Sequence, residues 1–329
     1  MSLFLQELVV GICNGAIYAL IALGYTMVYG IIELINFAHG DIFMIGTFVS
    51  ITVLTTLGVG VGTQLSGWPL ISTMLITLFV CMMVCAVLGV VIERAAYRPL
   101  RNAPRLAPLI SAIGVSLILV DVGKLWKGIN LVSFPQFFPV VYYHIGPKDN
   151  GIDISSINIL VIAIAFALMV ALQWLVTRTR TGRAMRAVAQ DREAAALMGV
   201  NVDRIIAITF FIGAGLAGAA AFIYGLQFPS TIFSIGFTLG LFAFTAAVLG
   251  GIGNLVGAML GGVLIGIIEA LASLIPDTTD PNYQGLFGLR LGLPHGGSPW
   301  HEAVIFAVLI LILVFRPSGL LGQKLPEKV

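Results

Sequence analysis

The polar residues best suited to handle a solute lie near the beginning of an otherwise apolar chain. Between two apolar runs, residues 29–46 (YGIIELINFAHGDIFMIG) carry four polar or titratable side chains: Glu33, Asn36, His39 and Asp41. Asn14 and Tyr18 lie one helical turn apart in the preceding run. Such groups are costly at membrane depth and usually face a water-filled cavity or a partner. One interpretation is a broken helix whose polar groups border a translocation route. The other is a turn that is polar only because water reaches it.

A polar segment, residues 178–204, contains six arginines in 27 residues and separates two further apolar runs. Asp191 is a typical helix N-cap and Gly199 a typical helix stop, so residues 192–198 are predicted to form a short helix. A second short helix is predicted over residues 183–189, started by Thr181. This polar segment is long enough to bind a partner, and the rest of the chain is organised around it.

The sequence lacks several motifs that are typical of nucleotide hydrolysis and metal binding. It contains no G-x-x-x-x-G-K-[ST] phosphate loop, no H-E-x-x-H and no C-x-x-C. The chain is therefore not expected to hydrolyse ATP, to be an enzyme, or to hold a cofactor. Its three cysteines all lie in apolar runs and are interpreted as small core residues rather than metal ligands.

Composition identifies a polytopic membrane protein. Of the 329 residues, 59% are hydrophobic and only 10% are charged, too few to cover the surface of a soluble domain. The net charge is +2 and the cations lie in loops rather than in one basic patch, so nucleic-acid binding is not expected.

The apolar runs predict an all-α membrane bundle in a single domain, residues 1–329. A bilayer core of about 30 Å requires about 20 helical residues, and the absence of period-2 alternation excludes a barrel. Nine spans are predicted, of which the second and the last three are short or interrupted by glycine, so eight is the alternative: 8–29, 40–57, 70–92, 106–125, 157–176, 205–224, 237–249, 256–274 and 303–315.

Loop charge predicts the orientation of these spans. With nine spans, 13 of the 17 lysines and arginines fall on the side of the polar segment and four on the other. Because cytoplasmic loops carry the excess of positive charge, the N-terminus is expected outside and the polar segment and C-terminus inside.

The external segments 127–156 and 276–300 are too broken to span, and either cover the membrane interface or dock a soluble partner. Asp121 and Glu269, near the ends of apolar runs, are expected at the interface.

Two short matches predict an inverted internal repeat. VCAVLGVV at 84–91 and VGAMLGGV at 256–263 agree at five of eight positions, and Ile-Phe-x-Ile-Gly recurs at 42–46 and 232–236. On the predicted topology the members of each pair cross the membrane in opposite directions, as in transporters built from inverted repeats. The alternative is chance similarity, which is common between apolar helices. The glycine ladder Gly253, Gly257, Gly261 is interpreted as tight helix packing.

The motif Glu193-Ala194-Ala195-x-x-x-Gly199 resembles the EAA loop of ABC importer permeases. Blocks at 18–41, 91–101, 182–201, 247–262 and 315–322 also look like permeases of branched-chain (hydrophobic) amino acid importers, the LivH-like half, in the family's order. The Ile-x-Leu-Pro ending of the general EAA pattern is missing after Gly199. The external segments look longer or more divergent than is typical, and related permeases serve branched-chain or other neutral amino acids, or urea and short amides.

The resemblance implies a multi-pass permease of the bacterial plasma (inner) membrane, in contact with membrane lipid. It implies three kinds of protein partner: a second, homologous permease, two ABC ATPase subunits that hydrolyse ATP, and an extracytoplasmic solute-binding protein. The expected ATPase-coupling residues are Arg183, Arg186, Asp191, Glu193, Ala194, Ala195 and Gly199. The expected pathway residues are Asn14, Tyr18, Asn36, His39 and Asp41. A single-chain secondary transporter or a channel is the alternative from a different class.

Overall fold

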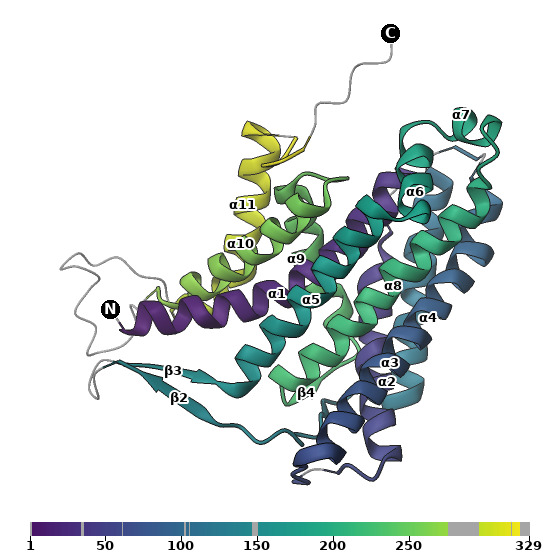
Figure 1. The fold of residues 1–329 in the computed structure, drawn as a ribbon. Coiled ribbons are helices and arrows are strands. Elements are labelled where there is room, and N and C mark those ends of the chain that lie inside the picture. Colours follow the sequence, from purple (N-terminus) through teal and green to yellow (C-terminus); the bar gives the residue numbers. More distant parts are fainter. Residues whose placement is uncertain are drawn as a thin grey trace.

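The computed structural model describes residues 2–33, 36–60, 62–101, 103–104, 106–146, 151–275, 296–316 and 318–322, which form a bundle of long helices (Figure 1). Within these residues, eight helices are long and apolar enough to cross a membrane, and a shorter apolar one, α9, accompanies them. The prediction of eight or nine membrane helices is confirmed. The eight long helices and α9 are α1 (Ser2–Ile32), α2 (Ala38–Thr56), α3 (Gly67–Ile92), α4 (Leu106–Lys127), α5 (Ser156–Arg178), α8 (Val202–Gln227), α9 (Ile235–Gly250), α10 (Leu255–Ser273) and α11 (His301–Phe315, which a 3-10 turn precedes directly).

The remaining elements are short. The polar segment holds α6 (Arg180–Gln190) and α7 (Arg192–Leu197), and α3 continues through a π-helical turn, η1 (Glu93–Tyr97), into a 3-10 turn, η2 (Arg98–Leu100). Another 3-10 turn, η3 (Ser298–Trp300), precedes α11.

Segment 127–156, which was predicted to be external, contains strands that the all-α prediction omitted. A hairpin pairs β2 (Tyr142–Ile145) with β3 (Ile152–Ser155), and β1 (Val132–Ser133) pairs with β4 (Ser230–Thr231), both antiparallel. Phe134 and Phe137 are buried. Strands this short give no alternation long enough to read from sequence. Most of segment 276–300 lies outside the described residues, as do five of the orientation cations: Arg105, Lys148, Arg290, Lys324 and Lys328.

The bundle has two distinct ends. Glu7 in the first turns of α1 accepts a hydrogen bond from Ser273 at the end of α10, and Gln6 donates to the backbone of Asp153 in the hairpin. We call this the hairpin end. The last turn of α1, the start of α10 and the start of α8 lie at the other, polar-segment end, together with residues 318–322. The helices therefore alternate in direction as the nine-span topology requires.

Helix packing agrees with the predicted inverted repeat. α1 packs along α10 as α8 packs along α3, and α2 crosses α9. Glycines mediate these contacts: a Cβ at Gly266 would lie 2.2 Å from the Gly15 nitrogen, and one at Gly218 would lie 2.5 Å from the Cys81 oxygen. α1 and α8 run antiparallel, as an inverted pairing of α1–α3 with α8–α10 requires, and the repeat itself stays a prediction. The glycine ladder is confirmed for Gly257 and Gly261, which touch α9, but not for Gly253, which lies in a turn at φ +91°.

Candidate functional site

The polar segment folds as the two predicted short helices, with a different start for the first. The Thr179 hydroxyl accepts a hydrogen bond from the Gly182 nitrogen at 3.0 Å, so Thr179 caps α6, and the expectation that Thr181 would do so is wrong. α6 extends beyond residues 183–189 at both ends. Met185 and Val188 are buried, which packs α6 against the bundle, while Arg183 is exposed.

Local capping fixes both ends of α7. One Asp191 carboxylate oxygen accepts from the Glu193 and Ala194 nitrogens at 2.9 and 3.0 Å. Gly199 has φ +84°, its nitrogen donates to the Ala196 oxygen, and the Val200 nitrogen donates to the Ala195 oxygen, both at 3.0 Å. This pair of bonds is a Schellman motif, which requires the left-handed backbone that glycine provides. The predicted cap and stop are confirmed.

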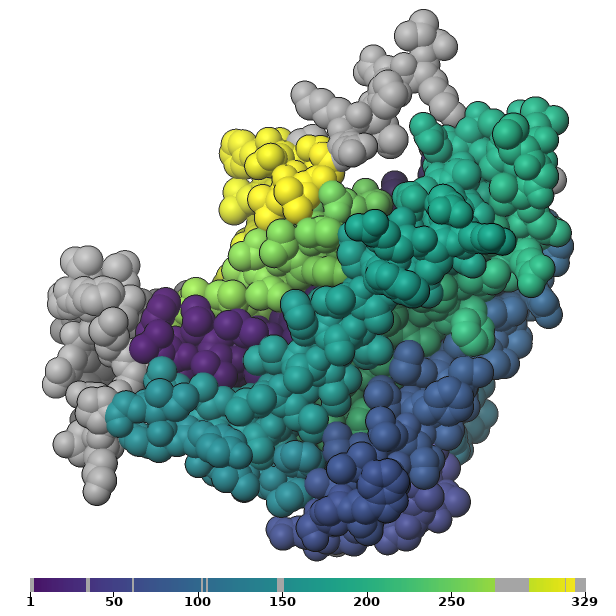
Figure 2. Space-filling model, in the orientation of Figure 1, coloured from purple at the N-terminus to yellow at the C-terminus, as the bar shows by residue number. Residues whose placement is uncertain are grey.

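α7 presents a compact surface outward. Ala195 is buried against the bundle, whereas Glu193, Ala194 and the large side chains Leu197 and Met198 face away, the last two 89% and 84% exposed. Figure 2 shows the polar segment protruding at one extremity of the molecule. An exposed apolar tip on a rigid helix is typical of a protein contact.

Two arginines of the polar segment hold neighbouring helices. Arg186 donates to the backbone oxygen of Val176 near the end of α5. Arg192, at the start of α7, donates from Nε and Nη2 to the Ile31 oxygen at 3.2 and 2.7 Å, in the last turn of α1. The latter contact was not predicted, because no local pattern links positions so far apart in sequence.

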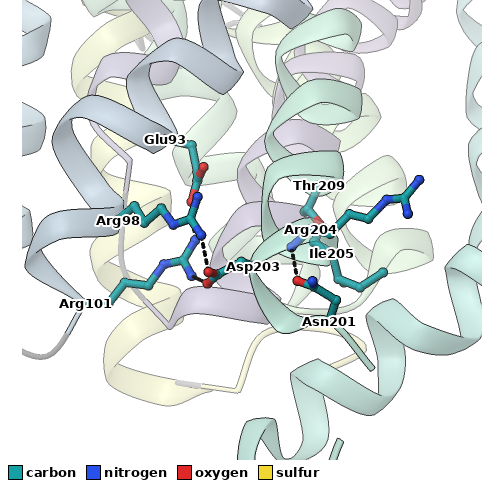
Figure 3. A network of polar contacts seen from close by, with 8 residues as sticks. All are labelled: Glu93, Arg98, Arg101, Asn201, Asp203, Arg204, Ile205 and Thr209. Carbon is teal, nitrogen blue, oxygen red and sulfur yellow. Dashed lines mark hydrogen bonds and ion pairs between the residues drawn. The ribbon is translucent and has the colours of Figure 1, made fainter. Parts of the chain in front are cut away.

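An ionic network joins the end of α3 to the start of α8 (Figure 3). Arg98 and Arg101 both pair with Asp203 in the first turn of α8, and Arg101 also pairs with Glu93. Glu93 is 1% exposed and Arg101 17%, whereas Arg98 and Asp203 are each 47% exposed. The network thus has a buried pair and an outer pair that water reaches.

The same turn contacts the connection between α1 and α2. The Tyr97 hydroxyl, in η1, donates to Asn36 Oδ1 at 2.7 Å, and both side chains are buried. Together with the Arg192 contact to Ile31, this bond ties the polar segment and its neighbours to both sides of that connection.

Three polar side chains at or just before the start of α2 are buried: Asn36, His39 and Asp41. This burial argues against the interpretation that they are polar only because they lie in a solvent-exposed turn. The His39 ring packs edge-on to Tyr25, with centroids 4.7 Å apart. Asp41 Oδ2 accepts from the Ser116 hydroxyl of α4 at 2.5 Å. Glu33, by contrast, is exposed at φ +55°.

Comparison of the sequence with known protein families identifies the family. The family described as the permease component of the branched-chain amino acid transport system matches residues 8–313. This chain belongs to that family. The permease is 43% identical to the high-affinity branched-chain amino acid transport system permease protein BraD of Pseudomonas aeruginosa and 42% identical to LivH of Escherichia coli K12, in each case over 99% of this chain and 98% of the relative.

A partial match covers 50% of the permease and 46% of a probable branched-chain amino acid transport permease protein LivM of Methanocaldococcus jannaschii, at 28% identity. No solved structure matches the chain.

The five expected pathway residues of the permease divide into two groups. Tyr18 donates to Glu269 Oε2 at 2.6 Å and Asn14 Nδ2 donates to the same oxygen at 3.5 Å. Tyr25, which touches His39, lies seven residues beyond Tyr18, about 10 Å along α1. Asn14 and Tyr18 therefore form a separate group with Glu269, nearer the hairpin end.

This grouping corrects the expectation for Glu269. Its side chain is not an interface charge but a half-buried acceptor between α10 and α1. Asp121 does fit the interface expectation, because it is exposed and pairs with Lys124 at 3.0 Å. Within the described residues, no three His, Cys, Asp or Glu side chains come together to hold a metal ion.

Proposed function

We propose that this permease is the membrane subunit of an ATP-driven importer that carries branched-chain or other hydrophobic amino acids into the cell. The observation that carries the proposal is the match to BraD and LivH over nearly the whole length of both chains. The same match favours amino acids over the alternative of urea or short amides.

ATP hydrolysis is assigned to partner subunits, because the sequence has no phosphate-binding loop. We expect two ATPase subunits, a second homologous permease and an extracytoplasmic binding protein. The partial likeness to a LivM protein supports a paired permease of the same family.

Reconstitution tests this function. Purified permease alone in liposomes should neither hydrolyse ATP nor accumulate leucine, whereas addition of the second permease, the ATPase subunits and the binding protein should give ATP-dependent leucine uptake. Gradient-driven uptake by the single chain would instead assign it to secondary transporters, and passive flux would assign it to channels. If urea inhibited leucine uptake completely, the result would favour the alternative of a permease for urea or short amides.

The polar segment is the proposed docking surface for the ATPase. Exposed side chains of α6 and α7, including Arg183, Glu193 and Ala194, would contact it, with Leu197 and Met198 as an apolar tip. Asp191, Ala195 and Gly199 hold α7 in shape, and Arg186 holds the end of α5. The contacts from Arg192 to Ile31 and from Asp203 to η2 support transmission of movement to α1 and α8.

The proposed orientation puts the polar segment in the cytoplasm and the N-terminus outside, supported by the accumulation of positive charge at the polar-segment end. A cysteine at Arg183, which is exposed, tests it. In intact cells, Arg183→Cys should resist a membrane-impermeant thiol reagent and should react once the membrane is opened. Labelling from outside in intact cells would reverse the topology and remove the coupling proposal with it.

A further inference from the structure

A cavity of about 340 Å³ lies between α1, α2, α4 and α9, near the start of α2. Most of its lining is aromatic or aliphatic: Phe37, Ile113, Leu117, Phe237, Leu241 and Phe244. Tyr25, Ser116 and Asp41 supply the polar side chains. This size and this mixture, apolar walls with a few polar groups, are typical of small-molecule sites.

Asp41 is the single carboxylate in the described lining, and the lining contains no lysine or arginine. Its side chain is 3% exposed. Oδ2 accepts from Ser116, but Oδ1 has no hydrogen-bond partner among the described residues. A carboxylate buried in its charged form is stabilised by a cation or by hydrogen-bond donors. The described lining places no positively charged side chain beside Asp41.

The backbone of α9 packs closely against Asp41. α2 and α9 cross at Gly40, Gly236 and Gly240, and a Cβ placed on Gly236 would lie 2.8 Å from Asp41 Oδ1. Glycine at position 236 permits this close approach, because any larger residue would press its side chain onto the carboxylate. The cavity reaches the outer face of the bundle at Leu117 and Phe237, which are 62% and 67% exposed. Lipid tails supply neither donors nor charge, so this opening suits an aqueous route or the paired permease.

We propose that this cavity binds the transported aliphatic amino acid, with its ammonium group beside the Asp41 carboxylate and its side chain against Phe237, Leu241 and Phe244. The positive end of the α2 dipole lies at the same place, because Phe37 and Asp41 flank the first turn of α2, and it favours the substrate carboxylate. The inference rests on the proposed function and adds the chemical basis for recognition of an amino acid within the membrane.

Cysteine protection in the assembled importer tests this site. Ile113→Cys and Leu241→Cys, made separately and confirmed to import leucine, provide reporters on two walls of the cavity. The native cysteines Cys13, Cys81 and Cys85 are buried. At ten times its half-protecting concentration, leucine should slow N-ethylmaleimide labelling of both reporters about tenfold. 4-Methylpentanoate, which has the same side chain and carboxylate but no ammonium group, should leave the labelling rate unchanged.

Matched variants isolate the role of Asp41. Asp41→Asn should abolish protection by leucine while the reporters still react, and Asp41→Glu, which keeps the charge, should retain part of it. Phe166→Cys, on the exposed face of α5, should not be protected by leucine. Protection by 4-methylpentanoate equal to that by leucine would overturn the proposal. So would protection that survives Asp41→Asn, or reporters that are unprotected or already covered in importers that still take up leucine. Absence of leucine uptake by the wild-type importer would instead refute the proposed function.

Discussion

Glu193→Arg and Gly199→Val are each expected to leave the permease inserted and paired but to separate ATP hydrolysis from uptake. Glu193 is exposed on the outer surface of α7, and reversal of its charge against a complementary partner costs several kcal/mol, so ATPase binding should weaken at least about tenfold. Gly199 has open space around it, so valine there acts through backbone strain of about 1 kcal/mol at φ +84°, together with any clash with the partner.

Pull-down of the ATPase subunits and leucine-stimulated ATP hydrolysis in liposomes measure this effect. The bundle supplies matched controls at its other end. Asp121→Arg reverses an exposed charge, and Gly128→Val introduces a side chain at φ +86° in open space. Both controls should couple normally. If Glu193→Arg and Gly199→Val couple as well as these controls, the polar segment does not dock the ATPase.

Arg101→Ala is expected to destabilise the permease by about 3–5 kcal/mol, because it leaves the buried Glu93 carboxylate without its cation. Arg98→Ala removes a pair that is half exposed on both sides, so it should cost about 1 kcal/mol or less. Adding Glu93→Gln to Arg101→Ala should recover much of the loss, since the unpaired buried charge is then gone.

The temperature at which half of the detergent-solubilised permease has aggregated measures the apparent stability of each variant. We expect this temperature to be highest, and nearly equal, for wild type and Arg98→Ala. It should be lower for the double variant and lowest for Arg101→Ala. Equal midpoints for Arg98→Ala and Arg101→Ala would mean that the buried pair contributes no more than the exposed one.

Features with a local physical cause could be predicted from the sequence. Apolar runs must become helices in lipid, so all nine were located, with ends shifted by a few residues. Asp191 and Gly199 act on backbone groups within a few positions of themselves, and both were identified correctly. Even local signals can compete. Thr179 and Thr181 are similar candidates in the run RTRTG, and the structure selects Thr179.

Contacts between distant segments could not be predicted in the same way. Tyr18 and Glu269 are separated by 251 positions, and Arg98 and Asp203 by 105. A charge near the end of an apolar run looks the same whether it faces lipid headgroups or a tyrosine on another helix, which is why Glu269 was misread. The cavity beside Asp41 depends on where α4 and α9 pack, and their positions come from the whole bundle.

The enclosed position of α2 has a consequence for how the chain is made. Its most apolar window has a mean hydropathy of 1.4, the lowest of the eight long helices, and it packs against α3, α4, α8 and α9. The last two are synthesised only after the polar segment. Until the ribosome has synthesised α8 and α9, the helices that pack around Asn36, His39 and Asp41 are incomplete. Early α2 must therefore stay near the insertion machinery or close to α1, and a chain arrested before α8 would expose the polar side chains at the start of α2 to lipid and to quality-control proteases.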